Sequence, residues 1–384
     1  MTPACKTTIF WLVMVVLLLL AVELLCRLSV YVIVKRTTEQ IGRGVNLLEF
    51  FSGDIYAGYR MPGNECEEFE VGAKAEFKFW EPGAPKWRVC TNRYGFRGRD
   101  FDFRKAGGAL RIVCMGDSST LGIDVNDDET FCALLPVRLS ELGFKRSAKI
   151  EALNLGVWGY SSFQGLITYE TFIKKNGLKP DIALIAYGAN DQLPLERLGK
   201  RFPDSFIYRL PGEGELIFSF GAFEYFGVIK VFHLSLNAAR SLYSVKRRTP
   251  GGFSERVTLD EFRANILGII RLAREDSAMP ILVSFIGEET EYKRALFELG
   301  NAEGVPVVDV FNVFGLEIEK VRKEGEYSGE REEIEKYLKR DEKYYQYLDT
   351  KYSPLLTTDG YHPGKIGHKI VAEEIAKVVI NSHK

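Results

Sequence analysis

The sequence lacks the features that mark nucleic-acid-binding, zinc-binding and repeat proteins. Its 384 residues carry a net charge of −1 and no long basic stretch, so nothing favours a nucleic-acid partner. None of its six cysteines forms a Cys-x-x-Cys pair, which argues against a zinc ribbon. No internal repeat or low-complexity tract is present. We therefore expect one sizeable globular domain with additions, or two domains, with no cofactor and no metal.

The first 36 residues differ in kind from the rest. Ile9 to Val22 is an unbroken apolar run, and Leu24 to Val34 largely continues it. The charges inside the segment, Glu23 and Arg27, are four residues apart and can pair on one face of a helix. A bilayer needs about 20 apolar residues, so the segment is long enough to span one. A cleaved signal peptide is the alternative, but no Ala-x-Ala-like site is present, so residues 1–36 predict a transmembrane anchor with its flanks.

Residues 37–108 predict a connector followed by a small β-rich element. From Glu67 to Asn92 apolar and polar residues alternate, and Pro and Gly break the pattern midway, as in a hairpin. Cys66 and Cys90 flank this segment and could pair in an oxidising compartment.

Residues 109–384 repeat a pattern of short apolar strand, loop and helix, which favours a parallel sheet covered by helices on both faces. The expected strands are 110–115, 149–155, 181–187, 281–285 and 305–310, and the expected helices are 130–142, 164–176 and 259–274, the last opening with a capping box from Thr258 to Glu261. Two insertions interrupt the pattern, an aromatic one at about 192–255 and a highly charged, helical one at 317–352. Cys114 and Cys132 fall in the strand and helix patterns, so we expect them to be buried thiols.

Ser118 lies in Gly116-Asp117-Ser118-Ser119, directly after the first of these strands. A serine here can simply cap the next helix, since Ser and Asp both suit that position. The alternative is a nucleophile, because reactive residues gather at the carboxyl ends of parallel strands and helix N–H groups favour developing negative charge. No Gly-x-Ser-x-Gly surrounds the serine, which excludes the nucleophile turn of an α/β-hydrolase.

Gly159 and Asn190 each follow a later strand of the same sheet. Gly159 ends Asn154-Leu-Gly-Val-Trp-Gly and could serve a turn that needs a positive φ, while Asn190 could cap a helix or stabilise its own loop. The functional alternative makes both of them oxyanion donors, Gly159 through its backbone N–H and Asn190 through its side-chain amide.

Asp359 and His362 lie three residues apart near the C-terminus, so one helical turn or a tight loop brings them together. The carboxylate can then orient the imidazole as a general base and stabilise its cation. Only four histidines occur in the chain, which limits the candidates for this role. A metal site of His362 with His368 would lack further ligands at suitable spacing, and we expect His368 to be a surface or packing residue.

The segments that contain Ser118, Gly159, Asn190 and the pair Asp359 and His362 resemble, in this order along the chain, the sequence blocks of the SGNH (GDSL-type) hydrolase family. The resemblance covers roughly residues 111 to 384. The resemblance implies Ser118 as the nucleophile, His362 as the base and Asp359 as its partner. It implies Gly159, Asn190 and the Ser118 N–H as the oxyanion donors. The fold that it implies is a flavodoxin-like three-layer α/β/α sandwich with a five-stranded parallel sheet, here preceded by a transmembrane helix and a small β-rich element.

Two further features refine the resemblance. The segment Asn92-x-x-Gly-Phe-Arg-Gly looks like the membrane-anchored branch of the family. So does the hydrophobic helix expected near the N-terminus, in which Glu23 and Arg27 are embedded. Tyr160 stands where many esterases of the family carry Asp, and the two insertions could reshape the pocket. The resemblance therefore does not extend to the class of substrate.

These residues predict a serine esterase that hydrolyses an acyl ester, such as an acetyl ester, on a glycan or a lipid. One alternative is an O-acyltransferase in which a sugar hydroxyl replaces water and the same Ser-His-Asp triad acts. Another is a glycan-binding protein that retains the fold without catalysis. The oligomeric state has no signature in the sequence.

The orientation of the anchor has conflicting signals. Positive residues are more numerous after the apolar segment than before it, which by the positive-inside rule would place the body of the protein in the cytoplasm. The possible pairing of Cys66 with Cys90 and the family resemblance point outward. We predict a single-pass membrane protein with its catalytic domain outside the cytoplasm.

Overall fold

The structure is a computed structural model of the chain. It divides into two compact units, residues 51–211 with 253–384, and residues 1–50 with 212–252. The residues that it describes are 14, 18, 21–25, 61, 63–71, 80, 81, 83–144, 149–193, 204, 255–323, 325, 327–340 and 342–382. Nearly all of these belong to the first unit.

Five parallel strands form the central sheet of the first unit. They are β3 (Ala109–Gly116), β4 (Lys149–Gly156), β5 (Ile182–Ala186), β6 (Met279–Ser284) and β7 (Val307–Asp309), in the spatial order β4-β3-β5-β6-β7. Counted along the chain this is the order 2-1-3-4-5, which is that of flavodoxin-like doubly wound sheets. The prediction of a five-stranded parallel sheet is confirmed.

Apolar residues on alternate sides of the strands explain why the sheet is buried on both faces. In β3, Ile112 and Cys114 enter one hydrophobic cluster, whereas Val113 and Met115 enter the other. All five residues of β5 are buried. Strands with this composition are stable only between two layers of helices.

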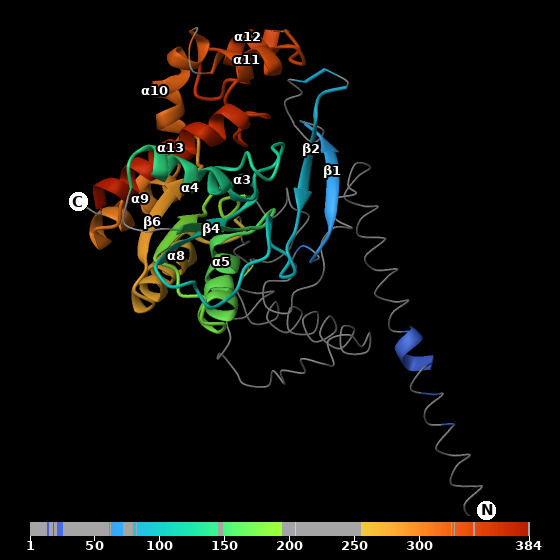
Figure 1. Cartoon of the computed structure of the whole chain (residues 1–384), viewed down its shortest axis with the longest axis vertical. Coiled ribbons are helices and arrows are strands. Elements are labelled where there is room, and N and C mark those ends of the chain that lie inside the picture. The colour runs from blue at the N-terminus through green and yellow to red at the C-terminus, as the bar shows by residue number, and fades with distance from the viewer. Residues whose placement is uncertain are drawn as a thin grey trace, which may run out of the picture. The chain divides into compact units, whose positions relative to one another are not determined.

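Helices supply those two layers. They are α3 (Ser118–Leu121), α4 (Phe131–Glu141), α5 (Ser162–Thr168), the π-helical η1 (Tyr169–Lys174), α8 (Leu259–Glu275), α9 (Glu291–Glu303), α10 (Val310–Arg322), α11 (Ser328–Glu335), α12 (Glu342–Tyr347) and α13 (Lys365–Ser382). Figure 1 shows α4 and α13 on one side of the sheet and α5 and α8 on the other. The capping box at Thr258 and Glu261 is present at the start of α8.

The small β-rich element is an antiparallel pair, β1 (Cys66–Glu70) and β2 (Lys86–Cys90). Cys66 lies directly opposite Cys90, and the two form a disulfide.

The prediction of buried thiols at Cys114 and Cys132 is wrong in part. Both side chains are buried, but they form a disulfide between β3 and α4. Their Cα atoms lie 6.2 Å apart, within the reach of such a bond. Helix α4 connects β3 to the neighbouring strand β4 and packs on β4, which brings together two cysteines that the sequence separates by 18 positions.

Two segments singled out in the sequence have different outcomes. Of residues 1–36 only 14, 18 and 21–25 are described, so the anchor lies largely outside the described residues, and among those described no helix meets the length and apolarity of a membrane span. Most of insertion 192–255 also lies outside them. Insertion 317–352 is helical, as expected, and contributes the end of α10 with α11 and α12.

Candidate active site

Three neighbouring strand ends bring the candidate residues to one edge of the sheet. Gly116, the last residue of β3, pairs with Gly156 at the end of β4 and with Ala186 at the end of β5. Ser118 follows β3, Gly159 follows β4 and Asn190 follows β5. The three residues therefore start from the same level of adjacent strands, at the edge where ligands bind to sheets of this type.

A tight turn places Ser118 at the first position of α3. A Cβ atom on Gly116 would lie 2.0 Å from the Thr120 Oγ1, so only glycine allows the helix to fold back so closely on its strand. Asp117 caps the helix by accepting a hydrogen bond from the Ser119 N–H. The capping role thus belongs to Asp117, and the Ser118 hydroxyl has another partner.

That partner is His362. The Ser118 Oγ lies 2.8 Å from the His362 Nε2, and the His362 Nδ1 lies 2.7 Å from the Asp359 Oδ2. The other carboxylate oxygen, Asp359 Oδ1, accepts the backbone N–H groups of Tyr361 and His362. This short turn fixes the carboxylate, which in turn fixes the imidazole toward the serine.

Charge within this group makes His362 a stronger base than usual. Burial by itself lowers the pKa of His362, but the charge and the hydrogen bond of Asp359 outweigh it and raise the pKa to about 9. Burial raises the pKa of Asp359, yet the His362 charge and hydrogen bonds hold it below its ordinary value. The pair therefore favours an imidazolium beside a carboxylate, the charge state that follows removal of a proton from serine.

Two backbone N–H groups at this edge of the sheet, those of Gly159 and Ser118, are suited to an oxyanion. Gly159 has a φ of +69°, and no acceptor for its N–H is found among the described residues. Ser118 is the first residue of its helix, where an N–H has no acceptor within the helix.

The third candidate donor, Asn190, forms hydrogen bonds to Asp117, the neighbour of Ser118, and to Tyr160, the neighbour of Gly159. Its side-chain amide donates to the Asp117 Oδ2 at 3.2 Å and to the Tyr160 carbonyl at 3.1 Å. An oxyanion would have to share or replace one of these bonds. The contacts nonetheless fix the amide between the loops that carry Ser118 and Gly159.

The block from Asn154 to Gly159 divides into a structural half and a half that faces the site. The Asn154 side-chain amide donates to the Thr120 carbonyl, and its oxygen accepts the Gly156 N–H, so Asn154 ties β4 to α3. Trp158, by contrast, is partly exposed, with its ring centroid 6.4 Å from that of His362. Tyr160 belongs to the hydrophobic core and is only 2% exposed.

Arg97 is a supporting residue whose role the sequence does not reveal. Its buried guanidinium donates to the carbonyls of Leu121 and Gly122, at the end of α3, and to that of Val125. It also pairs with Asp127 at 2.6 Å. The Asn92-x-x-Gly-Phe-Arg-Gly segment thus holds the helix that begins with Ser118.

His368 packs inside the protein. It is fully buried, its ring stacks on Phe131, and its Nδ1 accepts the Phe131 N–H at 3.1 Å. Burial lowers the pKa of His368 to about 3, so the ring is neutral at physiological pH. Of the two alternatives for this residue, the packing role is confirmed.

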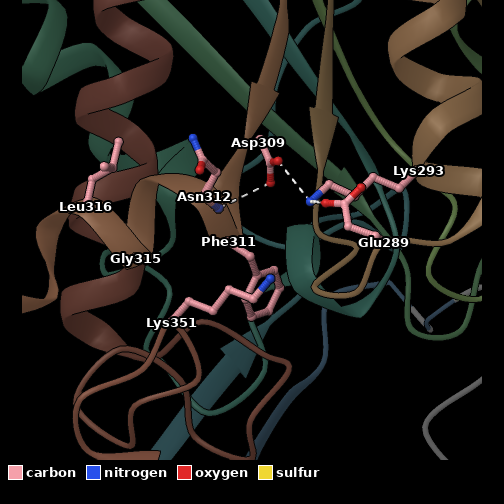
Figure 2. Close-up of a pocket in the computed structure, with 8 residues that line it drawn as sticks. All are labelled: Glu289, Lys293, Asp309, Phe311, Asn312, Gly315, Leu316 and Lys351. Atoms are coloured by element: carbon pink, nitrogen blue, oxygen red, sulfur yellow. Dashed lines mark hydrogen bonds and ion pairs between the residues drawn. The ribbon is translucent and has the colours of Figure 1, made fainter.

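A separate hollow of about 170 Å³ lies among residues of α9, α10 and the loops beside them (Figure 2). The residues that line it are Glu289, Lys293, Asp309, Phe311, Asn312, Gly315, Leu316 and Lys351. Its buried cation, Lys293, already pairs with Glu289 at 2.8 Å and with Asp309 at 2.9 Å. A charged ligand would have to displace these ion pairs, and the hollow contains none of the candidate catalytic residues.

Comparison with known proteins finds similar solved structures only. No protein-family model and no curated protein matches the sequence. A lipase/acylhydrolase from Enterococcus faecalis is 16% identical over 70% of this chain and 95% of its own, with a TM-score of 0.39. A two-domain esterase active on acetylated mannans is 15% identical over 72% of this chain and 50% of its own (TM-score 0.39). The esterase EstA from a Pseudoalteromonas species is 11% identical over 71% of this chain and 97% of its own, with a TM-score of 0.37. Likenesses this distant leave the activity to be argued from the site itself.

Proposed function

We propose that this protein is a serine hydrolase of carboxylic esters. The observation that carries the proposal is the unbroken chain of contacts from Asp359 through His362 to Ser118, at 2.7 and 2.8 Å. Ser118 is 8% exposed and the His362 side chain is 22% exposed, so the pair lies just below the surface. A serine activated by a base and flanked by N–H donors is the arrangement required for acyl transfer.

The reaction proceeds in two stages. The Ser118 Oγ attacks the carbonyl carbon of the ester while the His362 Nε2 takes its proton, and the oxyanion is held by the N–H groups of Ser118 and Gly159 with the Asn190 amide. The imidazolium then protonates the departing alkoxide, which leaves as an alcohol. Water, deprotonated by His362, attacks the acyl-serine, the bond from the acyl carbon to the Ser118 Oγ breaks, and the acyl group leaves as the carboxylic acid while the returning proton restores the Ser118 hydroxyl. Asp359 stays ionised throughout and stabilises the imidazolium.

The substrate that fits best is a short acyl ester, such as an acetyl group, on a glycan or lipid. The low exposure of Ser118 favours a small acyl group. The partly exposed Trp158 ring beside His362 is suited to the face of a sugar ring, which favours a glycan.

The proposed location is outside the cytoplasm, on a membrane anchor formed by residues 9–34. Two disulfides, Cys66–Cys90 and Cys114–Cys132, support this location because such bonds persist in oxidising compartments. The anchor itself rests on the apolar sequence of that segment.

Hydrolysis of p-nitrophenyl acetate tests the proposal. Ser118→Ala removes the nucleophile, and we expect the turnover number to fall about 1,000-fold or more. Ser119→Ala is the matched control, because that neighbouring side chain is also buried but has no place in the chain of contacts. Equal activity in the wild type and Ser118→Ala would refute the assignment.

A further inference from the structure

A buried ion pair between Arg256 and Asp204 lies directly beneath the Gly159 loop. Arg256 is 3% exposed and Asp204 is fully buried, and the Arg256 Nε donates to the Asp204 Oδ2 at 2.6 Å. The remaining donors of the guanidinium reach the Gly159 carbonyl and, at 2.6 Å, the Gln164 Oε1. The same Asp204 oxygen accepts the Ser161 hydroxyl at 2.7 Å.

The other contacts of the pair named above end in residues 159–164, which are the last part of the connection from β4 to α5 and the first turn of α5. Apolar residues of similar size would often stabilise a core as well as a buried ion pair does. A guanidinium adds direction, because its planar fork holds several acceptors in a fixed arrangement. The pair thus imposes one geometry on this loop.

The geometry that it imposes includes the direction of the Gly159 N–H. Arg256 holds the Gly159 carbonyl on one side of the residue, while the Tyr160 N–H donates back to the Val157 carbonyl at 3.2 Å. The positive φ of Gly159 then sets where its own N–H points. The Tyr160 carbonyl, in the same turn, accepts the Asn190 amide, so a shift of this turn would move two oxyanion donors together.

The pair also joins a residue inside the aromatic insertion to the residue that follows it. Asp204 and Arg256 are 52 positions apart, and the Asp204 N–H donates to the Arg256 carbonyl at 3.0 Å. The Arg256 N–H donates to the Leu193 carbonyl, and the Val257 N–H to the Asp191 carbonyl. The chain before and after the insertion is therefore fastened together where it meets the Gly159 loop.

We propose that Arg256 and Asp204 are positioning residues for the oxyanion hole, which link the base of insertion 192–255 to the Gly159 turn. This inference rests on the proposed ester hydrolysis. Both side chains act through their contacts with Ser161 and Gly159, which set the direction of the Gly159 N–H and the position of the Asn190 amide.

Arg256→Lys is the main test, with Arg111→Lys as its matched control. Arg111 is also buried, pairs with Glu151 at 2.9 Å and donates to backbone carbonyls, but it lies at the start of β3, away from the edge that carries Ser118. Lysine keeps the charge but cannot hold three acceptors in one plane. We expect both variants to lower the melting temperature.

Only Arg256→Lys is expected to lower the turnover number, by about 10- to 100-fold, with little change in KM. The loss is smaller than the 100- to 1,000-fold that follows removal of a whole oxyanion donor. Its effect should also be non-additive with Asn190→Ala, because both changes act on the same hole. Asp204→Asn, which retains an acceptor oxygen, decides the question by the same comparison if Arg256→Lys does not fold.

The outcomes separate the two proposals. Wild-type protein without Ser118-dependent hydrolysis refutes the proposed function. If the wild type is active, and Arg256→Lys or Asp204→Asn has the same turnover number as Arg111→Lys, the positioning role alone is refuted. Additive effects of Arg256→Lys and Asn190→Ala would also overturn it, since independent sites give additive losses.

Discussion

His362 is the residue whose protonation controls the proposed reaction. The negative charge of Asp359 favours the imidazolium strongly enough to overcome burial, and the pKa of His362 reaches about 9. A general base must be neutral to accept the serine proton. The same charge that strengthens the base therefore leaves it mostly protonated at neutral pH.

A pH profile of kcat/KM follows from this. We expect kcat/KM to rise with pH and to level off above an apparent pKa of about 9, because only the neutral imidazole is active. Asp359→Asn removes the charge that raises this pKa, so the rise should move to lower pH while the maximum falls about 10,000-fold. A profile of kcat/KM that is flat from about pH 6 to about pH 10 would contradict the role of His362 as the general base.

Some site residues are visible in the sequence and others are not, for a physical reason. Ser118 and Asn190 follow expected strands and His362 is one of four histidines, so residue type and position make them candidates. The sequence marks Arg97 only as part of the Asn92-x-x-Gly-Phe-Arg-Gly segment, and Arg256 resembles any surface arginine. Both donate to backbone carbonyl groups, which every residue has, so only the folded chain shows which ones they hold.

At the scale of elements, the contact between β4 and α3 fixes the proposed nucleophile, Ser118. Gly156 at the end of β4 lies so close to α3 that a Cβ there would be 2.4 Å from the Leu121 backbone nitrogen. Asn154 reinforces the same contact from its side chain. The position of Ser118 therefore depends on a strand, β4, that is distant from it in the sequence.

Gly156→Ala is expected to lower the free energy of unfolding by about 1–3 kcal/mol, because the methyl group overpacks a contact made of backbone. It should also reduce ester hydrolysis in the protein that remains folded, since α3 must move. Gly329→Ala in α11 is the control, because no atom lies within 4 Å of a Cβ built there. Denaturant titration with activity at low denaturant measures both effects; unchanged stability in Gly156→Ala would contradict the tight contact.

The pattern of apolar residues predicts the strands and the longer helices well, because burial repeats along them. It does not predict that the helix expected at 164–176 begins at Ser162 and becomes π-helical from Tyr169. Nor does it predict the four-residue helix α3, which is too short to show a period. These elements depend on tertiary contacts that the pattern does not contain.

At the scale of the whole molecule, two disulfides add covalent links, one within the hairpin and one between the central sheet and a helix. Cys66–Cys90 closes the hairpin of β1 and β2, and Cys114–Cys132 fastens α4 to β3. An oxidising compartment suits both bonds, as does a body placed outside the cytoplasm on an apolar anchor.

Replacing Cys66 and Cys90 together by serine should lower the free energy of unfolding by about 3 kcal/mol, because the unfolded chain regains the freedom of a loop that spans 24 positions. Denaturant unfolding of wild type and variant under oxidising conditions measures the difference. The turnover number should not change, since neither cysteine contacts the site. Equal stability would show that the bond does not form in solution.

Covalent labelling by a fluorophosphonate, followed by peptide mass spectrometry, tests the role of Ser118 most directly. We expect one phosphonyl group per chain, on Ser118, with esterase activity lost in step with labelling and no label in Ser118→Ala. Label on another residue, or full activity in protein exposed to excess reagent, would contradict this role.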